Sequence, residues 1–291
     1  MTKNPMISGD HFRLGTFSTN CSSGMTPTKI AERWDNSWDN NLTLAKMLDD
    51  AGIDFMLPIA RWIGYGGETD FHGGVLETMT WAAGLLASTK NIAVFATIHT
   101  AANHPAVVAK QIATIDQIGH GRAGLNIVAG WNKPEYEALG LSLPDDHETR
   151  YAYAQEWFDL IRKLWASDTH FDWDGKYFKA KKIKGNPAPV RGSVPIINAA
   201  GSPQGRDFAT DNHKTVDDTP FGGGAGMGGM SAAIALRQIG IETAVYERVT
   251  ENKPVGAAIS VWSNGVKCLN YLGLEERTRE LGGIVETMSY L

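Results

Sequence analysis

Five apolar runs that alternate with segments of helical period constrain the fold of this chain most strongly. They are FRLGTF, DFMLPIAR, IAVFATIH, AGLNIVAG and VPIINAAG, at residues 12–17, 54–61, 92–99, 123–130 and 194–201. Between them, apolar residues recur on one helical face within 44–51, 76–86, 105–115 and 154–165. Strands so apolar, each followed by a helix, predict an α/β fold with a covered parallel sheet. The pattern alone leaves an open doubly wound sheet and a (β/α)8 barrel as alternatives.

Length and composition narrow the class of protein. A chain of 291 residues allows one large barrel or two modest domains, and 43% hydrophobic residues indicate a globular protein. The formal net charge of −5 argues against nucleic acid as a partner.

No apolar run approaches the about 20 residues that span a membrane, and no signal peptide is evident, so we expect a cytoplasmic protein. Only Cys21 and Cys268 are present and no histidine has ligand spacing, so we expect neither disulfide nor metal.

Polar and aromatic side chains stand at the ends of these runs. Ligands bind at the carboxyl ends of the strands in both architectures, so such residues are candidates for a binding site. The second run ends near Ala60, Arg61 and Trp62, the third ends in His99, and the fourth contains Asn126. A buried amide is costly unless it is hydrogen-bonded, so Asn126 indicates a ligand or a structural partner. The helix-like stretch after the fifth run would present backbone N–H groups to a phosphate. Together, these strand-end residues predict an aromatic ligand that carries a phosphate.

Several separate motifs agree in order and spacing with one family. They are Gly64-Tyr65-Gly66-Gly67, VVAKQIATIDQIGHGR at 107–122, NIVAGWNKPEYEALG at 126–140, Arg150-Tyr151 and AAGSPQGRDFA at 199–209. Residues 12–212 thereby resemble the luciferase-like, flavin-dependent monooxygenases, in the branch of the pyrimidine and dimethylsulfone monooxygenases. The resemblance implies a TIM-like barrel that uses reduced FMN and O2 to oxygenate a small-molecule substrate. It also implies a separate flavin reductase as partner, and a homodimer.

The resemblance also assigns roles by matching position. The implied FMN contacts are Ala60, Arg61, Asn126, Glu135, Arg150, Tyr151 and Ser202. Among them, Arg150 and Ser202 would bind the phosphate, while Asn126 would lie near the ring. His99 and Asn126 are the catalytic candidates, and the substrate would lie beside Trp62, Tyr65 and Trp131. Each has a structural alternative: Glu135 suits the first turn of a helix, Arg150 can cap one, and the aromatic rings can simply pack.

From Phe221 the sequence departs from this family. It reads Gly224-x-Gly226-x-x-Gly229, then a helical pattern, then a short strand that ends in Glu247. In the dinucleotide fingerprint, glycines let the backbone approach a pyrophosphate and an acid binds a ribose hydroxyl. This part of the chain, residues 222–291, resembles the N-terminal start of the FAD-dependent urate hydroxylases. By position, that resemblance implies FAD contacts at Gly228, Glu247, Arg248 and Ser260.

We therefore expect an incomplete TIM-like (β/α) barrel of about five βα units over residues 1–212. A junction at 213–223 and a partial Rossmann-like FAD-binding segment at 224–291 would follow. The strand that should precede the glycines is nearly absent, so a flexible junction is an alternative reading of the glycine cluster. The leading functional hypothesis is an FMN-dependent monooxygenase of a pyrimidine, sulfone or sulfonate. The alternatives are a FAD-dependent aromatic hydroxylase and an inactive fused or truncated flavoprotein.

Overall fold

The computed structural model describes residues 4–7, 13–198, 204–205 and 207–208. The chain divides into two units, Met1–Pro220 and Phe221–Leu291, and every described residue belongs to the first. The expected junction and FAD-binding segment lie outside the described residues. No helix among the described residues is long and apolar enough to cross a membrane.

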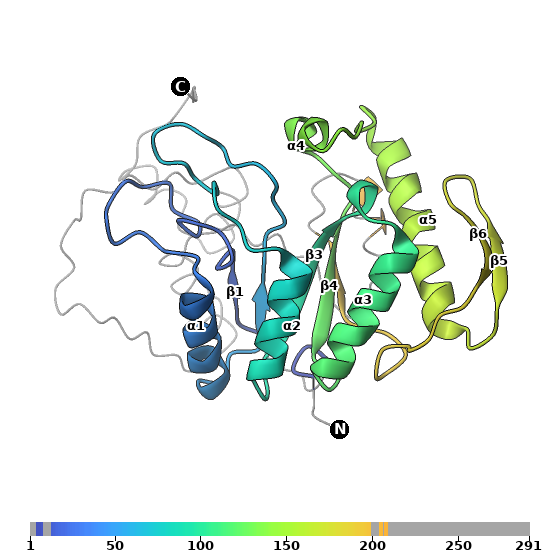
Figure 1. The fold of residues 1–291 in the computed structure, drawn as a ribbon, viewed down its shortest axis with the longest axis horizontal. Helices are drawn as coiled ribbons and strands as arrows, with labels where there is room; N and C mark the ends of the chain where they lie inside the picture. The colour runs from blue at the N-terminus through green and yellow to red at the C-terminus, as the bar shows by residue number, and fades with distance from the viewer. Residues whose placement is uncertain (1–3, 8–12, 199–203, 206, 209–291) are drawn as a thin grey trace, which may run out of the picture. The chain divides into compact units, whose positions relative to one another are not determined.

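A five-stranded parallel sheet forms the centre of the described part (Figure 1). Its strands, in spatial order, are β1 (Gly15–Phe17), β2 (Phe55–Leu57), β3 (Ala93–His99), β4 (Ala123–Val128) and β7 (Ile196–Ile197). Each neighbouring pair is parallel, and each strand lies within one of the five apolar runs. The predicted parallel α/β organisation is confirmed.

Helices cross from each strand to the next. They are α1 (Trp38–Asp50), α2 (Thr78–Ser88), α3 (Pro105–Ile118), α4 (Lys133–Ala138) and α5 (His147–Ala166). Side chains of Ser37, Glu77 and Asp146 accept free backbone N–H groups at the starts of α1, α2 and α5. In Figure 1, α1, α2 and α3 lie in a row across one face of the sheet, and packing of α2 on α3 and of α3 on α5 agrees with this view.

Successive residues of each strand pack on opposite faces of the sheet. Val94 and Ala96 join the large apolar core beneath the helices. Phe55 and Phe95 form a smaller cluster on the other, inner face, where their rings meet edge to face with centroids 5.9 Å apart. Gly124 lies beside the Phe95 ring, and a Cβ there would approach Phe95 Cδ1 to 2.4 Å. The inner face therefore requires a residue without a side chain at this point of β4.

An antiparallel hairpin between α5 and β7 was not predicted from the sequence. It consists of β5 (Phe171–Asp174) and β6 (Lys179–Ile183). Lysines fill most of β6, so the hydrophobic alternation by which strands are recognised is weak there. Two exposed ion pairs, Lys179–Asp174 and Lys181–Asp172, link the strands, and exposed pairs stabilise little.

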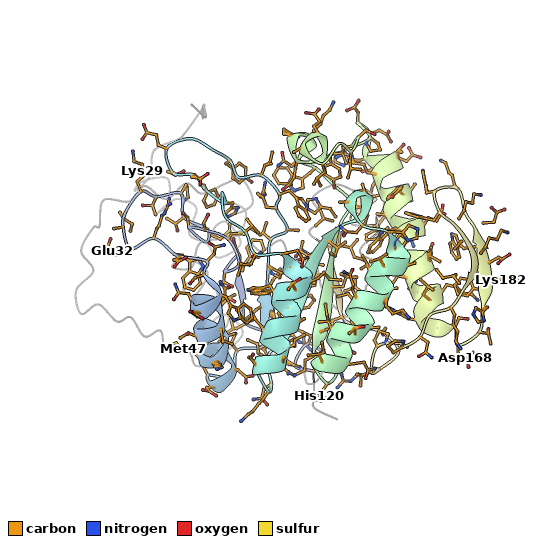
Figure 2. All side chains as sticks on the ribbon, viewed as in Figure 1. Lys29, Glu32, Met47, His120, Asp168 and Lys182 are labelled. Atoms are coloured by element: carbon orange, nitrogen blue, oxygen red, sulfur yellow. The ribbon has the colours of Figure 1, made fainter. Side chains whose placement is uncertain are left out.

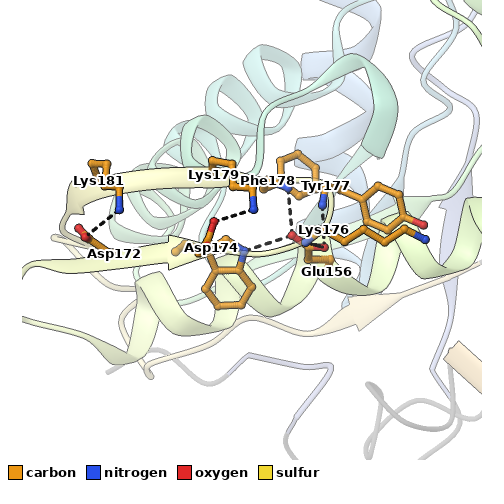
Figure 3. A network of polar contacts seen from close by, with 9 residues as sticks. Glu156, Asp172, Asp174, Lys176, Tyr177, Phe178, Lys179 and Lys181 are labelled. Atoms are coloured by element: carbon orange, nitrogen blue, oxygen red, sulfur yellow. Dashed lines mark hydrogen bonds and ion pairs between the residues drawn. The ribbon is translucent and has the colours of Figure 1, made fainter.

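Glu156 of α5 attaches this hairpin to the helix (Figure 3). Its carboxylate accepts hydrogen bonds from the backbone N–H groups of Lys176, Tyr177 and Phe178 at 2.9, 2.9 and 3.0 Å. Trp173 Nε1 donates a fourth bond at 3.2 Å. Burial by itself raises the pKa of Glu156, but these donors outweigh it and the pKa is lowered.

We predict that Glu156→Gln lowers the free energy of unfolding by about 1–2 kcal/mol at pH 7, because an amide is a poorer acceptor for four donors. Since the pKa of Glu156 is depressed in the folded state, its contribution is complete above the ordinary value of 4.5 and is lost as the pH falls through the folded value. Chemical denaturation at several pH values measures both effects. Glu148→Gln, which changes an exposed carboxylate in the first turn of the same helix, is the control. Equal losses in the two variants would contradict this role of Glu156.

Candidate functional site

A cavity of about 360 Å³ lies at the carboxyl ends of β2 and β3. Ala60, Arg61 and Trp62 border it from the loop after β2, and Thr97 and His99 border it from β3. Thr97 and His99 alternate with the core residues of β3, so they share the inner face with Phe95. The volume falls within the range of sites for small molecules.

Arg61 lies between two exposed aromatic rings. Its guanidinium carbon is 4.6 Å from the centroid of Tyr65 and 5.4 Å from that of Trp131, so cation–π attraction holds three predicted residues together. Arg61 Nε and Nη1 are buried and have no hydrogen-bond partner in the described part of the chain. Buried donors of a charged group are costly when unpaired, so a ligand with carbonyl or anionic oxygens would complete this position.

Glu135 connects α4 to the loop after β2. It is 1% exposed, and its Oε1 accepts a hydrogen bond from the backbone N–H of Trp62. Its Oε2 is buried and has no partner among the described residues. Glu135 also lies in the first turn of α4, as its structural alternative requires. A favourable position in the first turn does not explain why Glu135 Oε2 is buried without a hydrogen-bond partner in the described residues.

Asn126 lies on β4 directly beside Thr97 of β3. The Thr97 hydroxyl donates to the carbonyl oxygen of Pro58 at 2.5 Å, since that oxygen can only accept. Thr97 Oγ1 must then accept from Asn126 Nδ2, which lies 3.2 Å away. This chain of bonds determines the amide orientation and leaves Asn126 Oδ1 buried, with no partner in the described structure. A ligand here must bring an N–H or O–H donor.

The surroundings of His99 favour its neutral form. Its ring is 4% exposed and stacks on Tyr136 with centroids 5.7 Å apart. Burial lowers the pKa of His99, the negative charge of Glu135 acts in the opposite direction, and Arg61 adds to the lowering. The buried Tyr136 hydroxyl, whose pKa burial raises, has no partner among the described residues. A neutral imidazole at the cavity can hold or release a proton.

Among the described residues, six of the predicted site residues do not line this cavity: Tyr65, Asn126, Trp131, Glu135, Arg150 and Tyr151. Of these, Asn126, Glu135, Tyr65 and Trp131 contact residues that do line it. The Arg150 guanidinium donates to the carbonyl oxygens of Gly130 and Asp145 at 2.9 Å each and of Asp146 at 3.3 Å. It thereby supports the loop that carries Trp131. The Tyr151 ring lies 5.8 Å from that of Phe208. Ser202 lies outside the described residues, so a shared phosphate site of Arg150 and Ser202 stays a prediction.

The residues expected to contact FAD also stay predictions. All of them lie outside the described residues: Gly224, Gly226, Gly228, Gly229, Glu247, Arg248 and Ser260. Thr97 and His72, which both border the cavity, were not predicted from the sequence. The period of two along β3, which relates Thr97 to His99, was a usable signal. His72 lies in a glycine-rich loop and had no such signal.

We predict that Gly130→Ala costs more stability than Gly140→Ala. Gly130 has φ +114°, and a Cβ there would meet Tyr136 Oη at 2.5 Å and Leu143 Cδ1 at 2.6 Å. Gly140 has φ +69°, within the left-handed region, and open space around it, so Gly140→Ala meets no neighbouring atom and less backbone strain. The expected difference in free energy of unfolding is about 1–3 kcal/mol. If both variants unfolded at the same denaturant concentration, the packing ascribed to Gly130 would be wrong.

Comparison with known proteins places this chain in a family. The family model described as luciferase-like monooxygenase matches residues 12–216. The pyrimidine monooxygenase RutA of Pantoea ananatis is 35% identical over 198 residues, 68% of this chain and 54% of that protein. This chain thus spans about half the length of that relative.

Two further similarities complete the comparison. The structure of riboflavin lyase (RcaE) with modified FMN and riboflavin superposes with a TM-score of 0.59 at 22% identity, over 69% of this chain and 52% of that one. The FAD-dependent urate hydroxylase of Mycolicibacterium vanbaalenii is 90% identical over 68 residues, 23% of this chain and 17% of that protein. Both predicted resemblances are therefore confirmed. Because the luciferase-like model covers most of its length, the chain belongs to the luciferase-like monooxygenase family.

Proposed function

We propose that this chain is a monooxygenase that uses reduced FMN, delivered by a separate reductase, and O2 to oxygenate a small organic molecule. One observation carries the proposal. Arg61, Asn126 and Glu135 each hold a buried polar atom without a partner in the described part. All three positions are ones at which the family resemblance implies flavin contacts.

The chemistry of these atoms fits FMN. The isoalloxazine ring has carbonyl oxygens for the Arg61 donors and an N–H group for Asn126 Oδ1, and the ribityl hydroxyls are donors for Glu135 Oε2. A site whose donors and acceptors are already in place costs less free energy on binding than a site that must reorganise. The riboflavin lyase of similar fold holds a modified FMN, which supports this flavin as the first choice.

Bound reduced FMN would supply the electrons that activate O2, as is usual for the chemistry of a flavin cofactor. The chain orients the ring through Arg61 and Asn126. Trp62 lines the cavity, and the rings of Tyr65 and Trp131 contact Arg61, so these aromatic groups would limit the access of water. His99, neutral and buried at the cavity wall, would take up or release a substrate proton. A pyrimidine, a sulfone or a sulfonate is the proposed substrate class.

A FAD-dependent aromatic hydroxylase is the second candidate. The 90% identity to a urate hydroxylase favours it, although the match covers only 17% of that protein. The identity of the flavin released on denaturation separates the candidates: FMN supports the first and FAD the second. Oxidation of NADH by the purified chain alone would contradict the need for a separate reductase.

We expect Arg61→Met to weaken the binding of FMN by about tenfold or more, because a charge-assisted hydrogen bond to the flavin is lost. Titration of FMN fluorescence measures the affinity. Arg162→Met, which removes an exposed guanidinium paired with Asp159 on α5, is the matched control. Unchanged FMN affinity in Arg61→Met would exclude Arg61 as a flavin contact.

A further inference from the structure

A second cavity, of about 150 Å³, lies between α3, α5 and the segment 183–187 at the end of β6. Ala106 and Ala109 line it from α3, and Leu164 and Trp165 line it from α5. It shares no lining residue with the cavity at the carboxyl ends of β2 and β3. The proposed reaction therefore gives this second cavity no role.

The wall formed by the segment 183–187 is attached to both helices. On one side, Lys110 Nζ of α3 donates a hydrogen bond to the carbonyl oxygen of Asn186. On the other side, Gly185 lies so close to α5 that a Cβ there would come within 1.7 Å of the Leu164 carbonyl oxygen. Because both sides are held, a ligand would enter a cavity that is already formed, at little cost of reorganisation.

The interior of this cavity is apolar. The two alanines of α3, Leu164 and Ile183 contribute only aliphatic groups. Trp165 Nε1 donates to the carbonyl oxygen of Ala109 at 3.1 Å, so the one polar atom of the indole is already paired. A cavity of about 150 Å³ with apolar walls is large enough for one benzene ring. The interior therefore suits a ligand with a single aromatic ring.

Two ammonium groups border the same cavity. They belong to Lys110 and Lys184, and both side chains are exposed. Within the described ranges, neither forms an ion pair with a carboxylate, whereas Lys179 and Lys181 of the adjoining hairpin do. An ammonium group has three donors, so Lys110 keeps two beyond the one that Asn186 accepts. These positive charges favour a ligand whose anionic group stays at the water-exposed edge.

We propose that this cavity binds a small aromatic carboxylate. The ring lies between α3 and α5, and the carboxylate accepts hydrogen bonds from the ammonium groups of Lys110 and Lys184. A neutral ring lacks the ion pairs, and a carboxylate without a ring leaves the apolar interior unfilled. The site uses no residue of the proposed flavin cavity, so it is a further binding function of the chain.

Equilibrium dialysis of radiolabelled benzoate against the full chain tests the proposal. Benzoate should bind about fivefold more tightly than benzyl alcohol, because two exposed ion pairs contribute modestly. It should bind about tenfold or more tightly than acetate, because the ring buries apolar surface that acetate lacks. Benzoate that binds no more tightly than either of these two compounds, including the case in which none binds, overturns the proposal.

Two variants locate the binding site. Lys184→Met should lower the benzoate affinity about threefold, because one of the two ammonium groups is lost. Ala106→Leu should lower it about tenfold or more, because the larger side chain occupies the space of the ring. Undiminished binding in a folded Ala106→Leu variant places benzoate elsewhere and overturns the proposal.

Lys182→Met is the matched control. Lys182 is exposed at the outer edge of the same hairpin (Figure 2) and does not border the cavity. Its substitution removes the same charge from the same segment and should leave the benzoate affinity unchanged. Equal losses in Lys182→Met and Lys184→Met would show attraction by the overall charge of the hairpin and overturn the site. This comparison and the ligand series decide the proposal even if Ala106→Leu does not fold.

Discussion

Parallel pairing of β3 with β4 is the constraint on which the site depends. Their register places Thr97 beside Asn126 and His99 beside Val128. Because both strands alternate in phase, the polar residues of β3 and β4 share the inner face, away from the helices. A slip of β4 by one residue would turn Asn126 toward the apolar core, and a slip of β3 would do the same to Thr97 and His99; their polar atoms could not be satisfied there. The apolar residues that alternate with these polar residues along β3 and β4 thus determine on which face the polar residues lie.

Buried polar groups differ in their hydrogen bonding between the amino and carboxyl ends of the strands. At the amino ends, Asp49 accepts three backbone N–H bonds before β3. Asp116 accepts one from Ala123 and one from Val190, with both of its oxygens used. At the carboxyl ends, Arg61, Asn126 and Glu135 keep atoms without partners in the described structure. Most buried groups at the amino ends are paired and hold the loops, with Arg122 Nε as an exception in the described part, whereas the unpaired atoms at the carboxyl ends leave that end prepared for a ligand.

Local sequence patterns were sufficient to predict the sheet and the helices that cover it, because apolar runs and helical periodicity indicate which residues are buried. They were insufficient for β5 and β6, whose lysines face water and whose position depends on Glu156 of another element. The rule that ligands bind at strand ends found Arg61 and His99 in the cavity. It could not find His72, because that position depends on hydrogen bonds between two loops distant in sequence.

Arg150 illustrates the same limit within the site. Its charge and its place in a motif predict a phosphate contact, which stays a prediction, and no sequence pattern indicated that its guanidinium also donates to three carbonyl oxygens around the Gly130 turn. The central claim is that the unpaired atoms of Arg61, Asn126 and Glu135 bind one FMN molecule. A crystal structure of the complex with FMN tests this most directly. We predict flavin atoms within hydrogen-bonding distance of all three side chains; FMN bound elsewhere, with these atoms still unpaired, would contradict the account.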